Sequence, residues 1–408
     1  MFNDSKILIT GGTGSWGKTL TRLLLEEYNP KEIIIFSRGE LAQVMMRREF
    51  TDSRIKYVIG DVRDYDSVYR STIGVDYVFH LAALKHVPIC EDHPQEAIKT
   101  NIDGTTNIVN ASIENRVKKV IDVSTDKAVE PSNLYGMTKS VGEKIIIQAN
   151  ELSDFTKFVC VRGGNVMGSN GSVIPLFTQQ IKNGGPLTIT DERMTRYFLT
   201  LEEAIRLLFK ASETSIGGEM FVMHMPSCYI KDLAEVLMET YGQVEMKEIG
   251  IRPGEKFHET LISIHESILA YEYDENYYVI LPSGCSEEMK KKYEHLKPFG
   301  YRDYSSKTFL MNKQEIKKML SDGDFSHFAR NACEVKQHVR IDIATGTAVK
   351  GGLFNEECVP SETLFHSTIT ELKDSGENPV ASSLSEESVI QFGGDATTGL
   401  GFCSVKLS

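Results

Sequence analysis

The sequence predicts an α/β protein with a doubly wound parallel sheet, a smaller α/β domain for a substrate, and an extra β-rich segment at the C-terminal end. Near the N-terminus, an apolar run leads through a glycine-rich loop into a helical pattern. Further strand-like runs alternate with helical ones, which indicates a parallel sheet. Polar motifs follow these runs, at the strand ends where ligands bind in such sheets.

The first strand is the apolar run Lys6–Thr10, and a helical pattern follows over residues 20–25. Glycines at positions 11, 14 and 17 permit a tight turn, a close approach of the backbone to a pyrophosphate, and close packing of helix on strand. A lone glycine triplet is also typical of an ordinary loop, but the order of strand, glycines and helix favours a dinucleotide site. The predicted cofactor contacts here are Gly11, Thr13, Gly14, Ser15, Trp16 and Gly17.

The second strand, residues 32–36, ends in Ser37 and Arg38. An acidic residue at this point would bind the ribose 2′-hydroxyl of NAD, whereas a guanidinium can pair with a 2′-phosphate. The sequence therefore favours NADP over NAD. The alternative is that Arg38 points to solvent, with Glu40 weakening its field.

Three more strand-like runs end in polar or small residues. Because the carboxyl ends of parallel strands meet at one edge of the sheet, we expect a single shared site there. These runs are residues 55–59, 77–80 and 120–123, and the cofactor contacts predicted after the first two are Asp61, Val62, Ala82 and Ala83.

Tyr135 and Lys139 are spaced to share one face of a helix. The ammonium would then lower the pKa of the phenol, which is about 10 in model peptides. Asp126 and Lys127 lie just upstream and supply two further proton-transfer groups, so the set indicates oxidation coupled to elimination. Alone, a Tyr and a Lys at this spacing are most often a solvated helix face.

The adjacent acid and amine make opposing demands. Asp126 needs a raised pKa to act as an acid, and Lys127 must be neutral part of the time to act as a base. An ion pair between them would oppose both. We therefore expect their side chains to diverge around the substrate, or their protons to titrate as a coupled pair.

A second group of cations lies later in the chain. Arg252 precedes a Pro-Gly turn and can clamp a diphosphate bidentately, while Glu255 can accept from ribose hydroxyls. Arg196 offers a further cation near the phosphates. For Lys256 an exposed turn with incidental charge is an alternative. The other substrate contacts predicted are Asn165, Ser172 and Val173.

Composition limits the partners. The chain has 408 residues, 41% of them hydrophobic, and a formal net charge of −12, which argues against an overall nucleic-acid-binding surface. Seven cysteines without metal-like spacing fit a reducing compartment, and neither a signal peptide nor a long apolar run is apparent, so we expect a cytoplasmic protein without a membrane span. His258 and His265 are more typical of core or surface histidines than of metal ligands.

Taken together, these motifs resemble the extended short-chain dehydrogenase/reductases, which have a Rossmann fold, and within them the soluble UDP-N-acetylglucosamine 4,6-dehydratases. The resemblance covers about residues 1–320. Its motifs are at residues 11–17, 36–38, 60–64, 82–88, 99–101, 124–128, 135–139, 164–166, 171–175, 194–196 and 252–256.

The resemblance implies a reaction with no net redox change. Tyr135 would take the sugar 4-hydroxyl proton while NADP+ accepts the C4 hydride, with Lys139 on the nicotinamide ribose. Lys127 would remove the C5 proton, Asp126 would protonate the departing 6-hydroxyl, and the hydride would return to C6. Thr125 would orient the keto oxygen.

It also implies further contacts and partners. Lys85 would lie near the cofactor or the sugar, and Asn101 would bind substrate or belong to the adjoining polar network. The substrate would be a UDP-sugar, the product a 4-keto-6-deoxy sugar inverted at C5, and the protein a homo-oligomer.

Two departures concern the substrate. The family usually has Tyr where this chain has Gly163, and Arg where it has Asn170. Substrate identity is therefore less secure than reaction type. A sugar-nucleotide epimerase is the alternative, because it would use the same Tyr135 and Lys139 without needing Asp126 and Lys127.

We expect three parts: an NADP-binding domain at 1–165, a mainly substrate-binding domain at 166–325, and an extension or fused fragment at 326–408. The last part weakly resembles the C-terminal portion of a RAMP-type subunit of type III CRISPR effectors, and RNA binding is the function this would imply. Residues 326–408 contain 6 Lys and Arg against 11 Asp and Glu, and this excess of negative charge is unfavourable for binding RNA.

Overall fold

The computed structural model describes residues 1–167 and 173–320, and beyond them the backbone of four strands. The chain divides into two units, Met1–Ser326 and His327–Ser408. Each is described by itself. Among the described residues, no helix has both the length and the apolar character needed to cross a bilayer.

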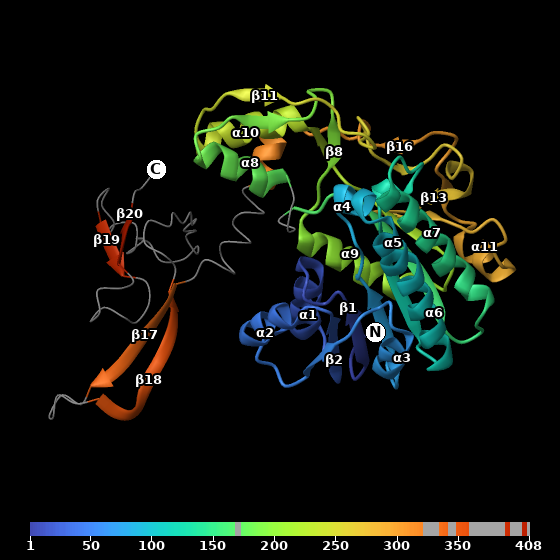
Figure 1. The fold of residues 1–408 in the computed structure, drawn as a ribbon, viewed down its shortest axis with the longest axis horizontal. Coiled ribbons are helices and arrows are strands. Elements are labelled where there is room, and N and C mark those ends of the chain that lie inside the picture. Colours follow the sequence, from blue (N-terminus) through green and yellow to red (C-terminus); the bar gives the residue numbers. More distant parts are fainter. Residues whose placement is uncertain (168–172, 321–333, 342–347, 359–387, 392–401, 406–408) are drawn as a thin grey trace, which may run out of the picture. The chain divides into compact units, whose positions relative to one another are not determined.

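A ten-stranded sheet is the centre of the first unit (Figure 1). Seven neighbouring strands of this sheet, in the order β3, β2, β1, β4, β5, β6 and β9, run parallel to one another. Beyond β9, the strands β14, β13 and β15 extend the sheet in antiparallel fashion. The predicted doubly wound α/β fold is thus confirmed. In sheet order the strands are β15 (Lys297–Pro298), β13 (Ala270–Glu272), β14 (Tyr277–Ile280), β9 (Met220–Met223), β6 (Lys157–Gly163), β5 (Lys119–Thr125), β4 (Tyr77–His80), β1 (Lys6–Thr10), β2 (Glu32–Ser37) and β3 (Ile55–Ile59).

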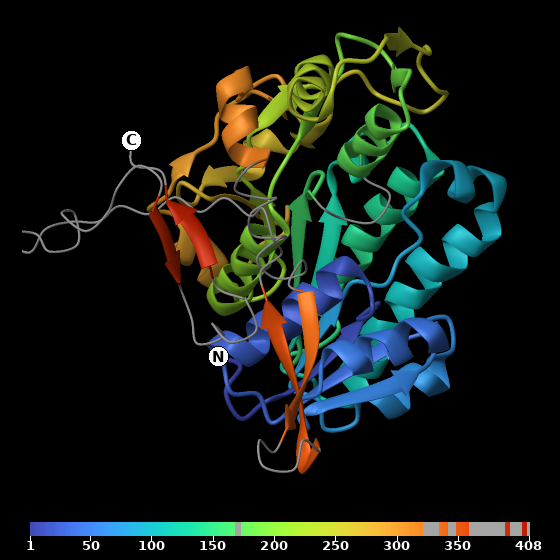
Figure 2. The ribbon, with the colours of Figure 1, turned by 90° about the vertical axis from the view of Figure 1, so that its left-hand side faces the viewer.

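Helices cover both faces of the parallel strands, which explains why most residues of β1, β2, β4, β6 and β9 are apolar and buried. On one side α1 (Ser15–Glu27) packs beside α9 (Leu201–Thr214). On the other, α6 (Gly104–Glu114) lies between α3 (Tyr65–Thr72) and α7 (Leu134–Gln148) (Figures 1 and 2). The remaining helices of this part are α2 (Glu40–Glu49), α4 (Val87–Asp92), α5 (Pro94–Ile98), the π-helix η1 (Lys99–Asp103), and the 3-10 turns η2 (Asp126–Ala128) and η3 (Ala149–Glu151).

A second layer of the first unit has its own hydrophobic core, which includes Phe177, Leu187, Phe198, Leu233 and Leu237. It lies beyond the carboxyl ends of the parallel strands (Figure 2). Residues after 165 therefore build this layer and also complete the large sheet. Its elements are α8 (Val173–Lys182), α10 (Ile230–Tyr241), β7 (Leu187–Ile189) with β11 (Met246–Glu248), and β8 (Thr195–Tyr197) with β10 (Ser227–Tyr229). The pair β12 (Thr260–Ile262) with β16 (Tyr304–Ser305), together with α11 (Glu287–Tyr293) and η4 (Ser267–Leu269), packs instead on the core of the large sheet.

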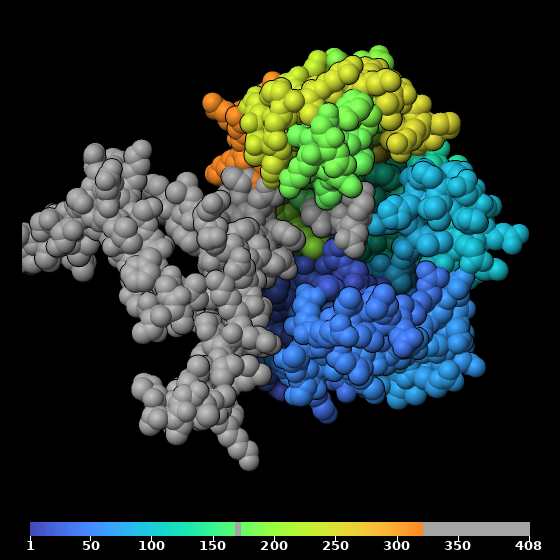
Figure 3. Space-filling view, turned by 60° about the vertical axis from the view of Figure 1, so that its left-hand side comes forward, coloured from blue at the N-terminus to red at the C-terminus, as the bar shows by residue number. Residues whose placement is uncertain are grey.

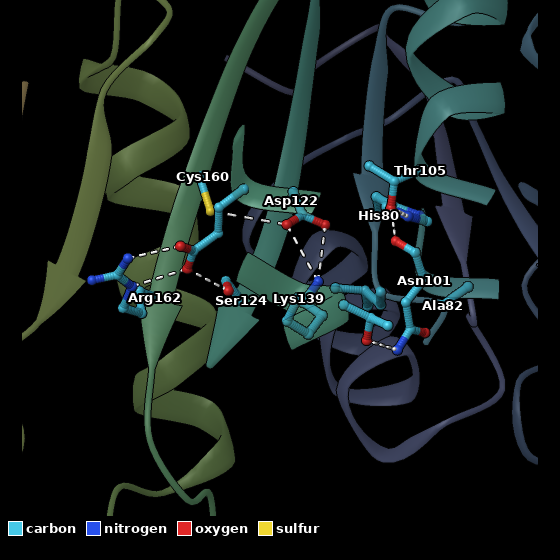
Figure 4. Close-up of polar contacts among 12 residues, drawn as sticks. His80, Ala82, Asn101, Thr105, Asp122, Ser124, Lys139, Cys160 and Arg162 are labelled. Carbon is cyan, nitrogen blue, oxygen red and sulfur yellow. Dashed lines mark hydrogen bonds and ion pairs between the residues drawn. The ribbon is translucent and has the colours of Figure 1, made fainter. Parts of the chain in front are cut away.

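Arg162 in β6 is the largest of the fully buried side chains, and three groups share its guanidinium. Figure 4 shows the paired hydrogen bonds to one of them, a carboxylate. Its Nε and Nη2 donate to Glu143 of α7 at 2.9 and 2.7 Å. Its Nη1 and Nη2 donate to Glu266 at 3.1 and 3.0 Å, and Nη1 also donates to the Leu261 carbonyl at 2.8 Å. Ser124 of β5 donates to the same Glu143 carboxylate at 2.6 Å. This network fastens α7 to two strands and to the segment around β12.

The second unit contains two antiparallel pairs, β17 (Glu334–Ile341) with β18 (Ala348–Cys358), and β19 (Ser388–Gln391) with β20 (Phe402–Val405). These strands agree with the expected β-rich segment. Residues 363–370, whose sequence is strand-like, and the glycine-rich stretch 393–401 lie outside the described residues.

Candidate active site

A cavity of about 850 Å³ opens at the carboxyl ends of the parallel strands. Figure 3 shows the hollow between the blue elements and the green and yellow elements of the first unit. Most of the predicted site residues line it, although they come from segments far apart in sequence. They are Gly11, Thr13, Gly14, Ser15, Trp16, Ser37, Arg38, Asp61, Val62, Ala82, Ala83, Lys85, Thr125, Lys127, Tyr135, Lys139, Asn165, Val173, Arg196, Arg252 and Glu255.

Three other predicted residues lie behind the lining. Gly17 packs the helix on the turn, since a Cβ there would lie 2.2 Å from the Gly12 carbonyl oxygen. Asn101 uses its side-chain amide within the protein: Oδ1 accepts from the Leu84 amide at 2.8 Å, and Nδ2 donates to Leu84 and Thr138 at 2.9 Å. Asp126 is completely buried. Ser172 and Asn170 lie outside the described residues.

The glycine loop forms a close-fitting cradle at one end of the cavity. Gly11 has a φ of +65°, and a Cβ there would lie 3.0 Å from the Ala82 backbone. Gly14 occupies the N-cap of α1 and brings no side chain, so the first amides of the helix remain directed at the cavity. Such a helix end favours an anion, and the loop can hold a pyrophosphate.

Beyond this cradle, Arg38 lines the cavity with about half of its side chain exposed, 3.9 Å from Asp61. Asp61 is held more closely by Arg63, whose Nη2 lies at 2.6 Å. Burial raises the pKa of Asp61, but the hydrogen bonds and charge of Arg63 outweigh it and leave this pKa below its usual value. Arg38 therefore has only a distant partner in Asp61, and its guanidinium can bind an anion.

Tyr135 is placed by the first turn of α7. Asn133 caps this helix by accepting from the Gly136 amide at 2.9 Å. Gly136 lies so close to η2 that a Cβ would be 2.1 Å from the Lys127 carbonyl oxygen. The glycine thereby brings Tyr135 beside Thr125, whose side chain lowers the pKa of the phenol.

The expected lowering of the Tyr135 pKa is wrong for this structure. Burial raises the pKa, and this outweighs the lowering by Lys139, Lys127 and the Thr125 hydrogen bond. Lys139 does lie close, but its ammonium is also 3.4 Å from the wholly buried Asp122 (Figure 4). The carboxylate offsets part of the positive field that would otherwise stabilise a phenolate.

Asp126 and Lys127 form an ion pair rather than diverging. The Asp126 Oδ1 accepts from Lys127 Nζ at 3.0 Å and from Thr125 Oγ1 at 2.9 Å, while Oδ2 is buried without a partner among the described residues. Burial lowers the pKa of Lys127, but Asp126 and Glu259 together raise it well above its usual value. Lys127 is thus an ammonium here. Of the two arrangements expected from the sequence, the divergence of the side chains is wrong, and a coupled titration of the pair stays a prediction.

The turn around Gly254 is docked onto the start of α7. The Gly254 carbonyl accepts from Ser132 Oγ at 2.8 Å and from Asn133 Nδ2 at 3.0 Å, and Lys256 Nζ donates to the Val129 carbonyl at 2.6 Å. Lys256 is therefore occupied within the protein. Arg252 and Glu255 of the same turn reach the cavity.

Arg196 lies beside the acid–base pair. Its Nη1 donates to the carbonyls of Thr195 and Phe257 at 2.8 and 3.2 Å, and its Nε lies 3.7 Å from Glu259.

At position 163, a Cβ would be 3.0 Å from Met223 Sδ, so Met223 occupies space that a larger side chain would need.

Sequence reasoning missed Asp122, Glu143 and Glu259. Asp122 carried a signal, since it is a charged residue inside an otherwise apolar strand run. Glu259 carried none, because its partner Lys127 is in a distant segment.

Among the described residues, no cluster of three or more His, Cys, Asp or Glu side chains could hold a metal, and His258 Nδ1 instead contacts Thr195 Oγ1 at 2.8 Å.

Comparison with known proteins identifies the family. The family described as polysaccharide biosynthesis protein matches residues 7–281. The chain belongs to this family. The family described as RAMP superfamily matches residues 259–404, which include the end of the first unit as well as the tail. The resemblances expected from the sequence are thus confirmed, while RNA binding stays a prediction.

Two relatives are named for different activities. The chain is 49% identical over 286 residues to a UDP-N-acetylglucosamine 4,6-dehydratase (inverting) of Campylobacter jejuni, covering 69% of this chain and 84% of the relative. It is 43% identical over 334 residues to a UDP-glucose 4-epimerase of Rickettsia akari, covering 80% and 98%.

Solved structures agree on the fold. The X-ray structure of Pen from Bacillus thuringiensis is 40% identical and aligns with a TM-score of 0.73 over 79% of this chain and 99% of that one. DesIV from Streptomyces venezuelae, a dTDP-glucose 4,6-dehydratase, aligns with a TM-score of 0.59 over 79% of this chain and 98% of that one, at 19% identity. This second likeness concerns the fold alone.

The packing of Gly136 on Lys127 leads to a test. We expect Gly136→Ala to lower the free energy of unfolding by about 2 kcal/mol, because the added methyl group collides with backbone. Gly142→Ala is the matched control on the same helix: its nearest neighbour would be 3.6 Å away, so the variant should gain roughly 0.5 to 1 kcal/mol. Urea denaturation measures both. Equal stability of the two variants would contradict the close approach.

Proposed function

We propose that this protein is an NADP-dependent 4,6-dehydratase of UDP-N-acetylglucosamine, forming a UDP-4-keto-6-deoxy sugar with inversion at C5. The observation that carries the proposal is one wall of the cavity, where Tyr135, Lys139, Thr125 and Lys127 meet with Asp126 directly behind. The identity to the Campylobacter jejuni dehydratase supports the substrate and the stereochemistry.

The cavity fits a nicotinamide dinucleotide. The glycine cradle and the uncapped start of α1 suit its pyrophosphate, and Arg38 suits a 2′-phosphate. When bound, the cofactor supplies a hydride acceptor at C4 of the sugar and a hydride donor at C6. Lys139 would hold the ribose hydroxyls. The small side chains of Ala82 and Ala83 line the cavity beside the glycine loop and leave room for the cofactor.

At C4 of the sugar, Tyr135 removes the hydroxyl proton. Its raised pKa in the free protein means that it is a phenol, so its ionisation must accompany binding of the cofactor and the substrate. Lys139 and Lys127 both favour the phenolate, and Thr125 can donate a hydrogen bond to it. Thr125 is also placed to contact the keto oxygen that forms.

At C5 and C6, the Asp126–Lys127 pair can supply an acid and a base together. Transfer of one proton from Lys127 Nζ to Asp126 Oδ1, across 3.0 Å, converts the ion pair into a neutral amine and a carboxylic acid. Lys127 then takes the C5 proton, and Asp126 gives its proton to the C6 hydroxyl, which leaves as water. The pair returns to its ionised form with no proton drawn from solvent.

A 4-epimerase is the second candidate. It is supported by the Rickettsia akari relative and by the burial of Asp126 behind Lys127, which keeps the acid out of the cavity lining. Epimerisation uses Tyr135 and the cofactor alone, whereas dehydration requires Asp126 to reach the 6-hydroxyl.

Incubation with UDP-N-acetylglucosamine in deuterated water separates these functions. Dehydration lowers the mass of the sugar nucleotide by about 18 units, before counting one deuteron at C5, whereas epimerisation leaves the mass unchanged. Proton NMR of the product reports the configuration at C5. UDP-glucose is the comparison substrate. If the mass stays unchanged with both sugar nucleotides, the proposal is contradicted.

Tyr135→Phe and Lys127→Ala should block different steps. The phenylalanine variant lacks the base for C4 oxidation, so neither reduced nicotinamide nor C5 exchange should appear. The alanine variant keeps Tyr135, so reduced nicotinamide should accumulate while dehydration and C5 deuteration fall by at least about a hundredfold. Absorbance and NMR measure the two steps. Normal C5 exchange without Lys127 would exclude it as the base.

Arg38→Ala tests the cofactor preference. Loss of a charged contact to the 2′-phosphate should weaken NADP binding by roughly ten- to hundredfold, or about 1.5 to 3 kcal/mol, and leave NAD binding nearly unchanged. Calorimetric titration with both dinucleotides measures this. Arg63→Ala is a matched control, because it frees Asp61 but leaves Arg38 in the cavity. Equal losses for both cofactors would make Arg38 structural.

A further inference from the structure

Glu259 is a buried carboxylate that joins two cations of the cavity wall. It is 3% exposed, and its Oε1 lies 3.5 Å from Lys127 Nζ and 3.7 Å from Arg196 Nε. Its Oε2 is also buried, without a hydrogen-bond partner among the described residues. Removal of a carboxylate from water costs free energy, which nearby positive charges must offset, and these two cations do so.

The backbone holds Glu259 in place. Its amide donates to Ser306 Oγ at 3.0 Å, and its carbonyl accepts from the Ser306 amide at 2.8 Å. Ser306 Oγ is in turn 2.6 Å from Thr195 Oγ1, in the strand that carries Arg196. The carboxylate and Arg196 therefore belong to one rigid frame, and only Lys127 comes from a different layer.

Charged groups from several elements face Lys127. Its positive charge is opposed by Asp126 within η2 and by Glu259 next to β12, and it is repelled by Arg196 of β8. Tyr135 of α7 and Lys256 of the docked turn also interact with it. Two acids and three cations thus share this region, and Glu259 is the acid that does not take part in the proton transfer proposed above.

We infer that Glu259 is a positioning residue that orients Lys127 toward C5 of the sugar and increases its basicity, while fixing Arg196 beside it. The inference rests on the proposed function. Asp126 is a carboxylic acid until it protonates the 6-hydroxyl, so Glu259 is the negative charge that stabilises the ammonium as Lys127 takes the C5 proton.

The test compares Glu259→Gln and Glu259→Asp in the full chain. The glutamine keeps the size of the side chain and removes its charge, so kcat for dehydration and for C5 exchange should fall at least tenfold, with KM changed less than threefold. Both limbs of the pH profile of kcat should move to lower pH by about one unit, since loss of a nearby negative charge lowers the pKa values of the pair. The aspartate should restore the position of both limbs and part of kcat.

Asp191→Asn is the matched control. Asp191 is also a buried carboxylate bound to an arginine, but Arg193 is 72% exposed and neither residue lines the cavity. The control should keep the wild-type pH profile, and thermal unfolding of all variants separates loss of fold from loss of function. An unmoved profile in Glu259→Gln, or an aspartate variant that behaves like the glutamine one, would overturn the inference while the wild type still dehydrates. Absence of dehydration in the wild type would overturn the proposed function instead.

Discussion

The buried guanidinium of Arg162 is the interaction on which the site depends. A charge removed from water is tolerated only when it is compensated by well-placed partners, and Arg162 has two carboxylates and a carbonyl. Those partners belong to α7 and to the segment around β12, and Ser124 adds β5. The helix that carries Tyr135 and Lys139 is therefore fixed in rotation and in height against the sheet. Removal of one partner would leave an uncompensated charge beneath the cavity.

The same requirement recurs nearer the cavity. Asp122 compensates Lys139 from below, and Asp126 with Glu259 compensates Lys127 from behind. Each cation therefore presents one side to the cavity and another to a buried acid. This explains how a chain with a net charge of −12 can present a cationic wall to an anionic sugar nucleotide. Tyr135 is a phenol in the free protein chiefly because burial raises its pKa by more than Lys139 and Lys127 lower it.

Glycine and backbone contacts set the spacing of these groups. Gly136 lets α7 approach Lys127, and the Gly254 turn is bonded to the residues that precede the same helix. The loop that carries Arg252 and the helix that carries Tyr135 consequently share one anchor. This anchor therefore fixes the positions of Arg252 and Tyr135, which both line the cavity, relative to each other.

The sequence by itself determined the fold class, the glycine loop and the Tyr135–Lys139 helix, because each depends on local periodicity and on residues close together in the chain. It also identified about half of the residues that line the cavity, since the ends of parallel strands must meet at one edge. Only the tertiary structure decided how charges pair across the layers. It joined Asp126 to Lys127, for which divergence or a coupled pair was expected, and brought Glu259 to them. It also committed the Asn101 amide to Leu84 and Thr138 and raised the Tyr135 pKa. These outcomes depend on burial and on contacts between distant segments, and neither follows from residue spacing.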